Sequence, residues 1–543
     1  MLGNLLSFFA AIVISAAIIP LMIRWAPRLG MVDIPDPRKV HTLPIPRVGG
    51  IGIVIGALIP VFLWVPLDAS LHAYLFGSLV LLAFGTWDDC RELGHYVKFI
   101  GQFIAVLVVV YYGDVYVHTL PFMDLVPLSE PVARAFTVFA MVGMINAVNH
   151  SDGLDGLAGG LSVLSLGCIA YLANMADHGA TVITIAIAAL GGVLGFLRYN
   201  THPARVFMGD GGSQFLGFTL GFLAVYLVQK VDPALSPALP ALFLGLPIVD
   251  ILAVFAQRVY GGMNWFRATR NHVHHRLLDL GFDHYEAVVI IYSIQTLFIV
   301  SAMLLRYDAD WLILLLYLGV CALLFLFLTI AKHTGWKAHQ PHTISRLSKL
   351  VGVMRQHTLL TKGPWRVVAL AIPLLFIMVS LLAVQVPRDF GIGAFILAVL
   401  MALYVGVIGA KDSIVIRVIT YVTAAFVIYL ETKFTGQSSQ LFHTIALAYF
   451  VGLTVAIGFA VRFAEGAQFK TTPMDFLVIF IVISIGILTR QDAEQSQLAF
   501  LVAKLVVVFY GCELILSRVH TRWNPLNVAT LTALVVLGFR GLL

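Results

Sequence analysis

One polar stretch lies between two hydrophobic runs: Asn146-Ala-Val-Asn149-His150-Ser-Asp152-Gly-Leu-Asp155-Gly-Leu-Ala-Gly159-Gly160 follows residues 132–148 and leads into residues 161–176. A charged or amide side chain in lipid costs several kcal/mol, so a cluster of such side chains indicates a functional role. Oxygen donors interleaved with glycine suit a hard cation and a phosphate, because glycine lets backbone N–H groups approach an anion closely. The stretch therefore predicts an active site at a membrane surface.

The composition of the whole chain supports a membrane setting. Of its 543 residues, 60% are hydrophobic and 11% are charged, and the mean hydropathy is +0.94. These values exclude an ordinary soluble globular protein and indicate a polytopic membrane protein. The four cysteines are scattered and suggest neither a disulfide framework nor a CxxC metal site. We expect the first run, at residues 5–23, to be retained as a span, since no basic region precedes it and no cleavage motif follows.

Eighteen hydrophobic runs are long enough to cross a bilayer, which predicts an all-α transmembrane fold with about 18 spans. Eleven fall in residues 1–331, which we expect to form a core, and seven in residues 367–543, which we expect to form an extension of unknown role. A basic stretch at residues 332–366 joins the two and is predicted to be a cytoplasmic linker, either a lipid-contacting segment or a topogenic anchor. The runs lie at about 5–23, 49–66, 71–87, 97–112, 132–149, 160–176, 180–197, 212–229, 238–258, 286–305, 311–331, 367–386, 390–409, 413–430, 441–461, 473–489, 497–516 and 526–540.

The distribution of basic residues predicts the orientation of these spans. Alternate loops hold 26 of the 34 Lys and Arg residues, so we assign those loops to the cytoplasm and both termini to the outer side. The last run is the weakest candidate, because Arg540 and its short length also suit an interfacial helix. All the polar motifs fall on the predicted cytoplasmic loops, at residues 33–50, 86–98, 146–160, 198–213 and 258–282.

Two of these motifs are rich in carboxylates. Asp88 and Asp89 end the third run, either as a solvated helix end or as a pair that approaches a metal–phosphate complex, with one member able to act as a base. Asp152 and Asp155 lie three residues apart and would share a face of a helical turn, as Asn146 and Asn149 would one turn earlier. Helix capping explains one such residue, but four with nearby glycines exceed what a cap needs.

Three further motifs carry a lone carboxylate or basic groups. Asp210 lies between glycines at a helix entrance, where the macrodipole favours anions. The sequence Arg270-Asn-His272-Val-His274-His275-Arg276 suggests donors to a diphosphate; a zinc site is the less favoured alternative, since helical zinc sites more often use an i,i+4 spacing, and a merely basic loop is another. The basic, proline-rich loop at residues 33–50 either serves only as a positive-inside topogenic anchor or binds the headgroup of an anionic lipid.

The ordered motifs resemble a known family. Asp88-Asp89, Asn146-x-x-Asn149-x-x-Asp152-Gly-Leu-Asp155-Gly-Leu-Ala-Gly-Gly, Phe207-Met-Gly-Asp210-x-Gly-Ser and His272-x-His274-His275-Arg-Leu occur in that order. They look like those of the polyprenyl-phosphate N-acetylhexosamine-1-phosphate transferases, over about residues 1–331. The His-x-His-His form resembles the WecA/TagO branch rather than the related MraY enzymes. Thr269 stands where WecA-like members usually have Asp, and residues 332–543 have no counterpart in the usual architecture.

The resemblance implies a reaction and a set of roles. N-acetylhexosamine 1-phosphate, with GlcNAc 1-phosphate favoured, would pass from a UDP-sugar to polyprenyl phosphate, with release of UMP. Undecaprenyl phosphate in a bacterial inner membrane is the favoured lipid. Mg²⁺, or alternatively Mn²⁺, would be held by Asn149 and Asp210. The reacting centre would contain Asp88, Asp89 and Asp152, and the substrate-binding residues would be Lys98, Asn146, Asp155, Arg270, His272, His274 and His275. Because a phosphate monoester has its second pKa near about 6, the lipid phosphate can attack with little help, and Asp88 is a base or a positioning group.

Several rival functions stay open at this level. A transporter would place ionisable residues at mid-bilayer, often in repeats, and a zinc-dependent hydrolase would use the histidines. An MraY-like enzyme would use a UDP-MurNAc-pentapeptide, and UDP-GalNAc or a 6-deoxy amino sugar would also suit the motifs. The C-terminal runs are compatible with a dimerisation element or with docking of a glycan-assembly partner. No feature suggests nucleic-acid binding.

Overall fold

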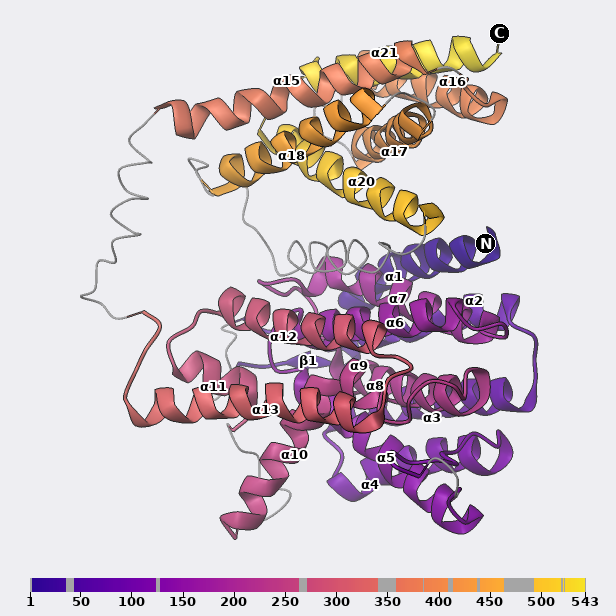
Figure 1. Ribbon diagram of the computed structural model, residues 1–543, viewed down its shortest axis with the longest axis vertical. Coiled ribbons are helices and arrows are strands. Elements are labelled where there is room, and N and C mark those ends of the chain that lie inside the picture. Colours follow the sequence, from indigo (N-terminus) through magenta and orange to yellow (C-terminus); the bar gives the residue numbers. More distant parts are fainter. Residues whose placement is uncertain are drawn as a thin grey trace. The chain divides into compact units, whose positions relative to one another are not determined.

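The computed structural model describes residues 2–35, 43–123, 127–262, 271–339, 358–383, 385–408, 414–436, 440–462, 493–518, 521 and 523–542. The described residues up to His339 form one compact unit, and those from Thr358 onward form a second. Figure 1 shows both as helical assemblies, with a single short pair of strands. The prediction of an all-α fold is confirmed for the residues that the structure describes.

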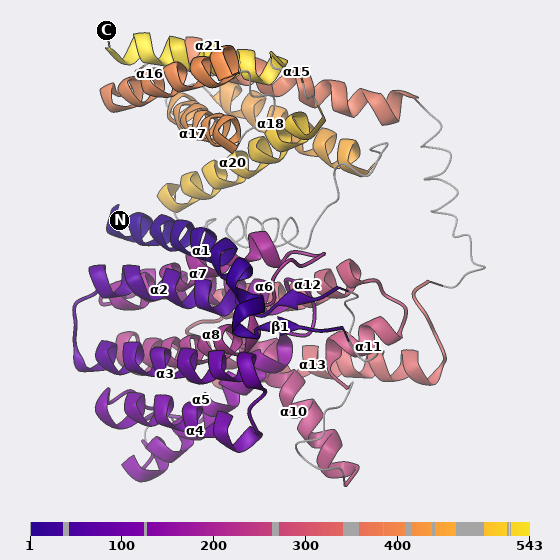
Figure 2. The ribbon, with the colours of Figure 1, turned by 180° about the vertical axis from the view of Figure 1, so that it is seen from behind.

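The first unit is a bundle of long helices that lie roughly parallel to one another in Figures 1 and 2. Its elements are α1 (Leu2–Leu29), β1 (Val32–Asp33), β2 (Ile45–Pro46), α2 (Gly49–Trp64), α3 (Ala69–Arg91), α4 (His95–Leu107), η1 (Val108–Tyr112), α5 (Glu130–Ser151), α6 (Leu157–Asn174), α7 (Ala180–Asn200), α8 (Gly209–Tyr226), η2 (Leu227–Val231), α9 (Pro240–Phe243), α10 (Gly245–Tyr260), α11 (Val273–Asp279), α12 (His284–Leu304) and α13 (Asp310–His333).

Helix α8 is the centre of this bundle. It packs against α3 and α5, and almost all of its length is buried. Small residues allow the closest approach: a Cβ added at Gly85 of α3 would lie 2.4 Å from the Cα atom of Gly211. Transmembrane helices associate largely through such tight packing, since lipid offers no hydrophobic drive between them. The contact brings the C-terminal end of α3 beside the N-terminal end of α8.

The second unit contains six described helices and one π-helical segment. They are α15 (Thr358–Leu382), α16 (Arg388–Ala402), η3 (Leu403–Ile408), α17 (Ile414–Gly436), α18 (Gln440–Arg462), α20 (Ala493–Arg518) and α21 (Pro525–Leu542). Two apolar clusters form its core, one around Phe376, Val427 and Cys512 and the other around Ala394, Met401 and Leu537. Charged side chains are paired inside it: Lys504 of α20 lies 2.7 Å from Glu431 of α17.

Twelve helices in the described part of the chain are long and apolar enough to cross a membrane, so the protein is a multi-pass membrane protein. Shorter apolar helices cover residues 49–64, 390–406 and 444–460. The run predicted at 238–258 is divided between α9 and α10, and α10 leaves the bundle obliquely (Figure 2). The run predicted at 473–489 lies outside the described residues.

Two local features differ from or sharpen the sequence prediction. The prediction that Asp152 and Asp155 share a helical turn is wrong: α5 ends at Ser151, α6 begins at Leu157, and Gly156 has a φ of +81° that a continuous helix does not allow.

At the other end of the chain, Arg540 of α21 donates hydrogen bonds to the carbonyl oxygens of Ser380 and Leu381 at the end of α15. The charge that weakened this candidate span therefore caps a neighbouring helix.

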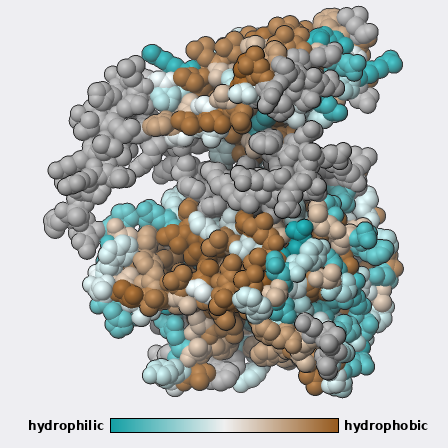
Figure 3. All heavy atoms as spheres, in the orientation of Figure 1, coloured by the Kyte–Doolittle hydropathy of each residue, from teal (hydrophilic) through white to brown (hydrophobic). Residues whose placement is uncertain are grey.

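The surface of the first unit matches a membrane setting. In Figure 3 hydrophobic residues gather over the middle of its helices, and hydrophilic residues lie toward the helix ends. Large side chains such as Leu315, Leu318 and Leu323 of α13 are more than half exposed. A lipid environment accounts for such exposure without a protein partner.

Candidate active site

An open cavity of about 960 Å³ lies at one end of the first unit. Stretches that are far apart in the sequence meet on its walls: the β1–β2 segment, the end of α3 with the start of α4, the end of α5 with the turn that follows, the segment from the end of α7 to the start of α8, and the starts of α11 and α12. Of the residues predicted from the sequence, those that line it are Asp88, Asp89, Lys98, Asn149, Asp152, Asp155, Asp210 and His275. The cavity is also lined by Arg47, Asn200, His202 and Arg205, which lie in the polar stretches 33–50 and 198–213 but were not singled out as site residues, and by His284, which lies in none of the predicted motifs.

Lys98 links two carboxylates at the centre of this cavity. Its Nζ lies 2.6 Å from Oδ2 of Asp88 and 2.7 Å from Oδ2 of Asp210. Two ionised carboxylates that meet in this way repel each other, and the ammonium group of Lys98 between them offsets that repulsion. The geometry therefore marks the space between α3 and α8 as a place for positive charge.

Asp89 holds the start of α8. Its two carboxylate oxygens accept hydrogen bonds from the backbone N–H groups of Asp210 (3.0 Å) and Gly211 (3.3 Å). A carboxylate at a helix N-terminus satisfies backbone donors that lack a partner and interacts favourably with the macrodipole. Asp89 thus fixes the backbone that carries Asp210, a contact that the adjacent aspartates alone did not predict.

The two predicted asparagines occupy different surroundings. Nδ2 of Asn149 donates to Oδ1 of Asp210 at 3.0 Å and to Oγ of Ser213 at 2.8 Å. Asn146, predicted to bind substrate, instead pairs with Gln102 on α4 (2.8 Å) and is not among the residues that line the cavity. Asn149 faces Asp210 and Ser213, whereas Asn146 belongs to a polar contact between helices.

The turn at residues 152–156 forms another wall. Burial raises the pKa of Asp152 to about 7, with the neighbouring charges of Asp210 and Asp155 adding to the effect. The backbone N–H of Gly156 donates to Oδ1 of Asn200 at 2.8 Å, which ties the turn to the end of α7. Both aspartates of the turn reach the cavity although they do not share a helical face.

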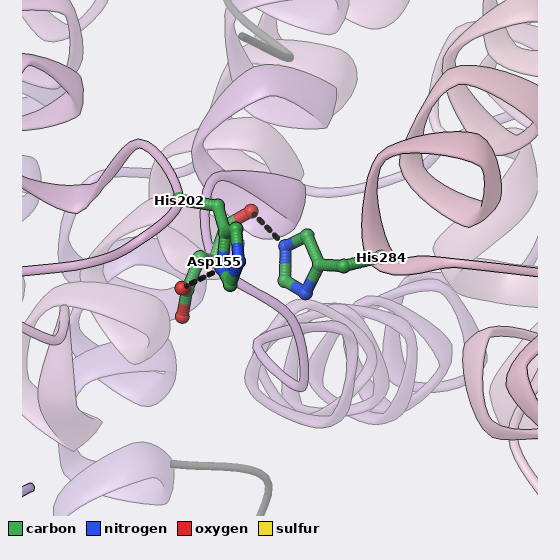
Figure 4. Close-up of side chains that lie close together, drawn as sticks. All are labelled: Asp155, His202 and His284. Atoms are coloured by element: carbon green, nitrogen blue, oxygen red, sulfur yellow. Dashed lines mark hydrogen bonds and ion pairs between the residues drawn. The ribbon is translucent and has the colours of Figure 1, made fainter. Parts of the chain in front are cut away.

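Figure 4 shows Asp155 with two histidines from other elements. Nδ1 of His202 lies 2.6 Å from Oδ2 of Asp155, and Nε2 of His284 lies 3.2 Å from its carbonyl oxygen. No motif spacing pointed to this cluster, since His202 stands in a loop and His284 opens a helix 82 residues later. Only the tertiary structure brings them together.

The His-x-His-His segment divides between the cavity and the protein interior. His275 lines the cavity, whereas His272 is buried with its Nδ1 2.8 Å from Oδ2 of Asp250 on α10. His274 lies behind the turn: a Cβ at Gly153 would come within 2.2 Å of its Nε2, and burial, reinforced by His275, lowers its pKa to about 3. Arg270 lies outside the described residues.

The donor set suits a hard divalent cation. Asp88 and Asp210 bring carboxylate oxygens to the region where Lys98 already lies as a cation, and Asn149 places its side-chain amide beside Asp210. Mg²⁺ prefers oxygen ligands and usually keeps waters and substrate phosphates in its shell. Zinc at the His-x-His-His segment fits less well, because Nε2 of His274 is packed against Gly153 and, of the three histidines, only His275 lines the cavity.

Comparison with known proteins places the chain among transferases. Residues 71–228 match the family model described as glycosyl transferase family 4. The chain is 33% identical over 337 residues to a probable undecaprenyl-phosphate N-acetylglucosaminyl 1-phosphate transferase of Bacillus subtilis (strain 168), covering 62% of this chain and 93% of that protein.

Two further relatives agree. A decaprenyl-phosphate N-acetylglucosaminephosphotransferase of Mycobacterium tuberculosis (strain ATCC 25618 / H37Rv) is 33% identical over 297 residues, which cover 49% of this chain and 74% of the relative. An undecaprenyl-phosphate alpha-N-acetylglucosaminyl 1-phosphate transferase of Escherichia coli (strain K12) is 30% identical over 306 residues, 54% of this chain and 82% of the relative. More than a third of this chain lies outside each match. Because the chain covers nearly the whole of a relative to which it is one-third identical, it belongs to the polyprenyl-phosphate N-acetylhexosamine-1-phosphate transferases of the WecA/TagO-like kind.

Proposed function

We propose that the chain transfers N-acetylglucosamine 1-phosphate from UDP-N-acetylglucosamine to a polyprenyl phosphate and releases UMP. An oxygen of the lipid phosphate attacks the phosphorus that carries the sugar. The bond between this phosphorus and the oxygen that bridges it to the nucleotide breaks, and UMP leaves with that oxygen. The product is a lipid-linked sugar diphosphate that begins a cell-wall or surface polysaccharide. The printed functions of the three relatives support this reading.

The single observation that carries the proposal is the convergence of Asp88, Lys98, Asn149 and Asp210 in one cavity. Phosphoryl transfer needs alignment and charge neutralisation more than covalent participation by the protein. Lys98 supplies a fixed positive charge, and the carboxylates and amide supply oxygens for a metal. A transporter or a hydrolase would need no such arrangement for two phosphates of different substrates.

Mg²⁺ is the cofactor that we propose, with Mn²⁺ as a substitute. Asp210 and Asn149 would hold it, with Asp88 close by; when bound, the ion neutralises charge on the diphosphate. Asp89 keeps the start of α8, and with it Asp210, in position. Asp88 acts as a base toward the lipid phosphate or orients it, and Lys98 restrains Asp88 in either case.

The nucleotide would lie toward the other wall of the cavity. Asp152 and Asp155 organise this part, and His275 and Arg205 bring further polar groups that can contact the diphosphate or the sugar. His272 and His274 act from behind by supporting α11 and the turn. The His-x-His-His segment therefore has both a binding role and a supporting role.

We further propose that the site faces the cytoplasm of a bacterial inner membrane, with about 18 spans and both termini outside. The concentration of basic residues on the loops that carry the site supports this orientation. Residues 1–331 would be the transferase core, 332–366 a basic linker, and 367–543 an extension that serves dimerisation or binding of a glycan-assembly partner.

The proposal is tested by measuring UMP release from the purified full-length chain. Undecaprenyl phosphate would be supplied with UDP-GlcNAc, UDP-GalNAc or UDP-MurNAc-pentapeptide, in Mg²⁺ and in EDTA. We expect Mg²⁺-dependent UMP release that is fastest with UDP-GlcNAc. Preference for the pentapeptide substrate would indicate an MraY-like enzyme, and sugar uptake into vesicles without UMP would indicate a transporter; either result contradicts the proposal.

A further inference from the structure

The cluster of Asp155, His202 and His284 suggests a role that the reaction itself does not require. Both hydrogen bonds to the carboxylate of Asp155 fall on the same oxygen: Oδ2 accepts from Nδ1 of His202 at 2.6 Å and from the backbone N–H of Ala204 at 3.0 Å. These donors fix the carboxylate plane and direct Oδ1 away from them. Since Asp155 lines the cavity, a fixed carboxylate there presents an acceptor in one orientation.

The second histidine holds the backbone of the same aspartate. Nε2 of His284 lies 3.2 Å from the carbonyl oxygen of Asp155, and its ring stacks on that of His202 with centroids 4.1 Å apart and planes 22° apart (Figure 4). Tyr285, the next residue of α12, donates from its hydroxyl to the carbonyl oxygen of His202 at 3.3 Å. The side chain and the backbone of Asp155 are therefore held by two elements, the loop after α7 and the start of α12.

A metal ion is the obvious alternative occupant of such a cluster. One ligand atom from each of the three residues lies within 4.8 Å of the others. However, the lone pair of an imidazole nitrogen lies in the plane of its ring, and the stacked rings keep their lone pairs in two nearly parallel planes, with centroids 4.1 Å apart. One ion cannot lie in both planes at once, so the two rings cannot both bind it with good geometry unless a ring turns. The nitrogens that face Asp155 are instead placed to donate protons to its oxygens.

We propose that His202 and His284 are positioning residues that hold Asp155 for recognition of the UDP moiety. The inference rests on the proposed function, because it assumes that a uridine nucleotide occupies this part of the cavity. His202 carries the larger effect, since it contacts the carboxylate, and His284 supports the turn through its carbonyl oxygen. The pair makes no contact with the Asp88–Lys98–Asp210 group, so its influence falls on binding of the nucleotide sugar rather than on the transfer step.

The chain offers variants that separate the hydrogen bond from the ring. The amide nitrogen of asparagine lies near the position of histidine Nδ1, and that of glutamine lies near Nε2. His202→Asn therefore keeps a donor to Asp155, whereas His202→Ala and His202→Gln do not place one there. For His284, glutamine is the conservative replacement. His178→Ala, in the exposed turn between α6 and α7, makes the same chemical change away from the cavity and serves as the matched control.

The experiment measures UMP release with each substrate varied in turn, together with UDP-GlcNAc binding by calorimetry. A hydrogen bond to a charged group is worth about 1.5–3 kcal/mol, and 1.4 kcal/mol corresponds to a tenfold change, so His202→Ala should raise KM and Kd for UDP-GlcNAc about tenfold or more. We expect kcat and the KM for undecaprenyl phosphate to stay within about threefold of the wild type. His202→Asn should restore most of the affinity, and His284→Ala should raise Kd about threefold to tenfold, with recovery in His284→Gln.

Three results would overturn the inference. Unchanged nucleotide affinity in His202→Ala would show that Asp155 needs no such support. Equal losses toward both substrates, without recovery in His202→Asn, would indicate a general structural role. One equivalent of tightly bound zinc in the wild type, lost in His202→Ala and in His284→Ala, would assign the cluster to a metal. If neither the wild type nor the His178→Ala control releases UMP, the proposed function itself fails, and this outcome is distinct from the three above.

Discussion

The packing of Gly85 against Gly211 offers a test of the site that changes no polar group. A Cβ added at Gly85 would lie 2.4 Å from the Cα atom and 2.5 Å from the backbone nitrogen of Gly211, and 2.8 Å from the carbonyl carbon of Asp210. Ordinary van der Waals contact begins at 3.4 Å, so Gly85→Ala requires α3 and α8 to separate by about 1 Å at this point. All three atoms belong to backbone and cannot rotate away.

The displacement falls on the residues that we assign to the reaction. It moves the start of α8, with Asp210, away from the end of α3, with Asp88 and Asp89, and weakens the hydrogen bonds that span this gap. A misplacement of about 1 Å can cost about 100-fold in rate. We therefore expect Gly85→Ala to lower kcat for UMP release by about 100-fold, measured as initial rates with both substrates near saturation.

Gly221→Ala is the matched control, because it makes the same substitution in α8. The nearest atom to a Cβ there is Cγ of Met141 at 3.6 Å, an ordinary contact, so its kcat should stay within about twofold of the wild type. Thermal unfolding in detergent separates loss of activity from loss of folded protein. A folded Gly85→Ala protein with the wild-type rate would refute the claim that the α3–α8 contact sets the geometry of the site.

Three further predictions address charge. Lys98→Met removes the cation that lies 2.7 Å from Asp210 and should lower kcat about 100-fold, with partial recovery in Lys98→Arg, as UMP release would show. The pKa of His274 is about 3 in the folded chain, against an ordinary value of 6.5, so as the pH falls from 7 to 5 only the unfolded chain gains this proton. The protonation should cost about 2 kcal/mol of folding stability over this range. Thermal unfolding at the two pH values should show this loss in the wild type and not in His274→Gln. Lys504→Met removes the ammonium group that lies 2.7 Å from the buried carboxylate of Glu431, which should destabilise the second unit by about 3–5 kcal/mol, whereas Lys504→Arg should not. An unchanged melting profile in Lys504→Met would contradict this.

The sequence predicted the parts of this structure that depend on local chemistry. Hydropathy identified most of the helices, because a bilayer forces the backbone to satisfy its hydrogen bonds within each segment. Residues such as Asp88, Asn149 and Asp210 stood out because polar groups at the ends of apolar runs are costly without a purpose. In the structure, these residues from separated segments line one cavity.

The sequence could not predict contacts that depend on how helices pack. Asp250 stands inside an apolar helix, and only the approach of α10 to α11 makes it the partner of His272. Spacing three residues apart suggested that Asp152 and Asp155 share a helical face, but the glycine at 156 breaks the helix and an open turn carries them instead. The contact of Asn146 with Gln102, in place of the predicted position in the cavity, also depends on helix packing, because the rotation of each helix about its axis decides where these side chains lie.

The central claim is that Asp210, presented by α8 to Asp88, Lys98 and Asn149, holds a divalent cation against the diphosphate of a nucleotide sugar. The most direct measurement compares UMP release by purified wild-type and Asp210→Asn proteins across a Mg²⁺ titration, with UDP-GlcNAc and undecaprenyl phosphate. We predict that Asp210→Asn loses at least about 100-fold in rate, because one charged metal ligand is removed while the shape of the site is kept. An Asp210→Asn protein with the wild-type rate and the same Mg²⁺ dependence would contradict the account.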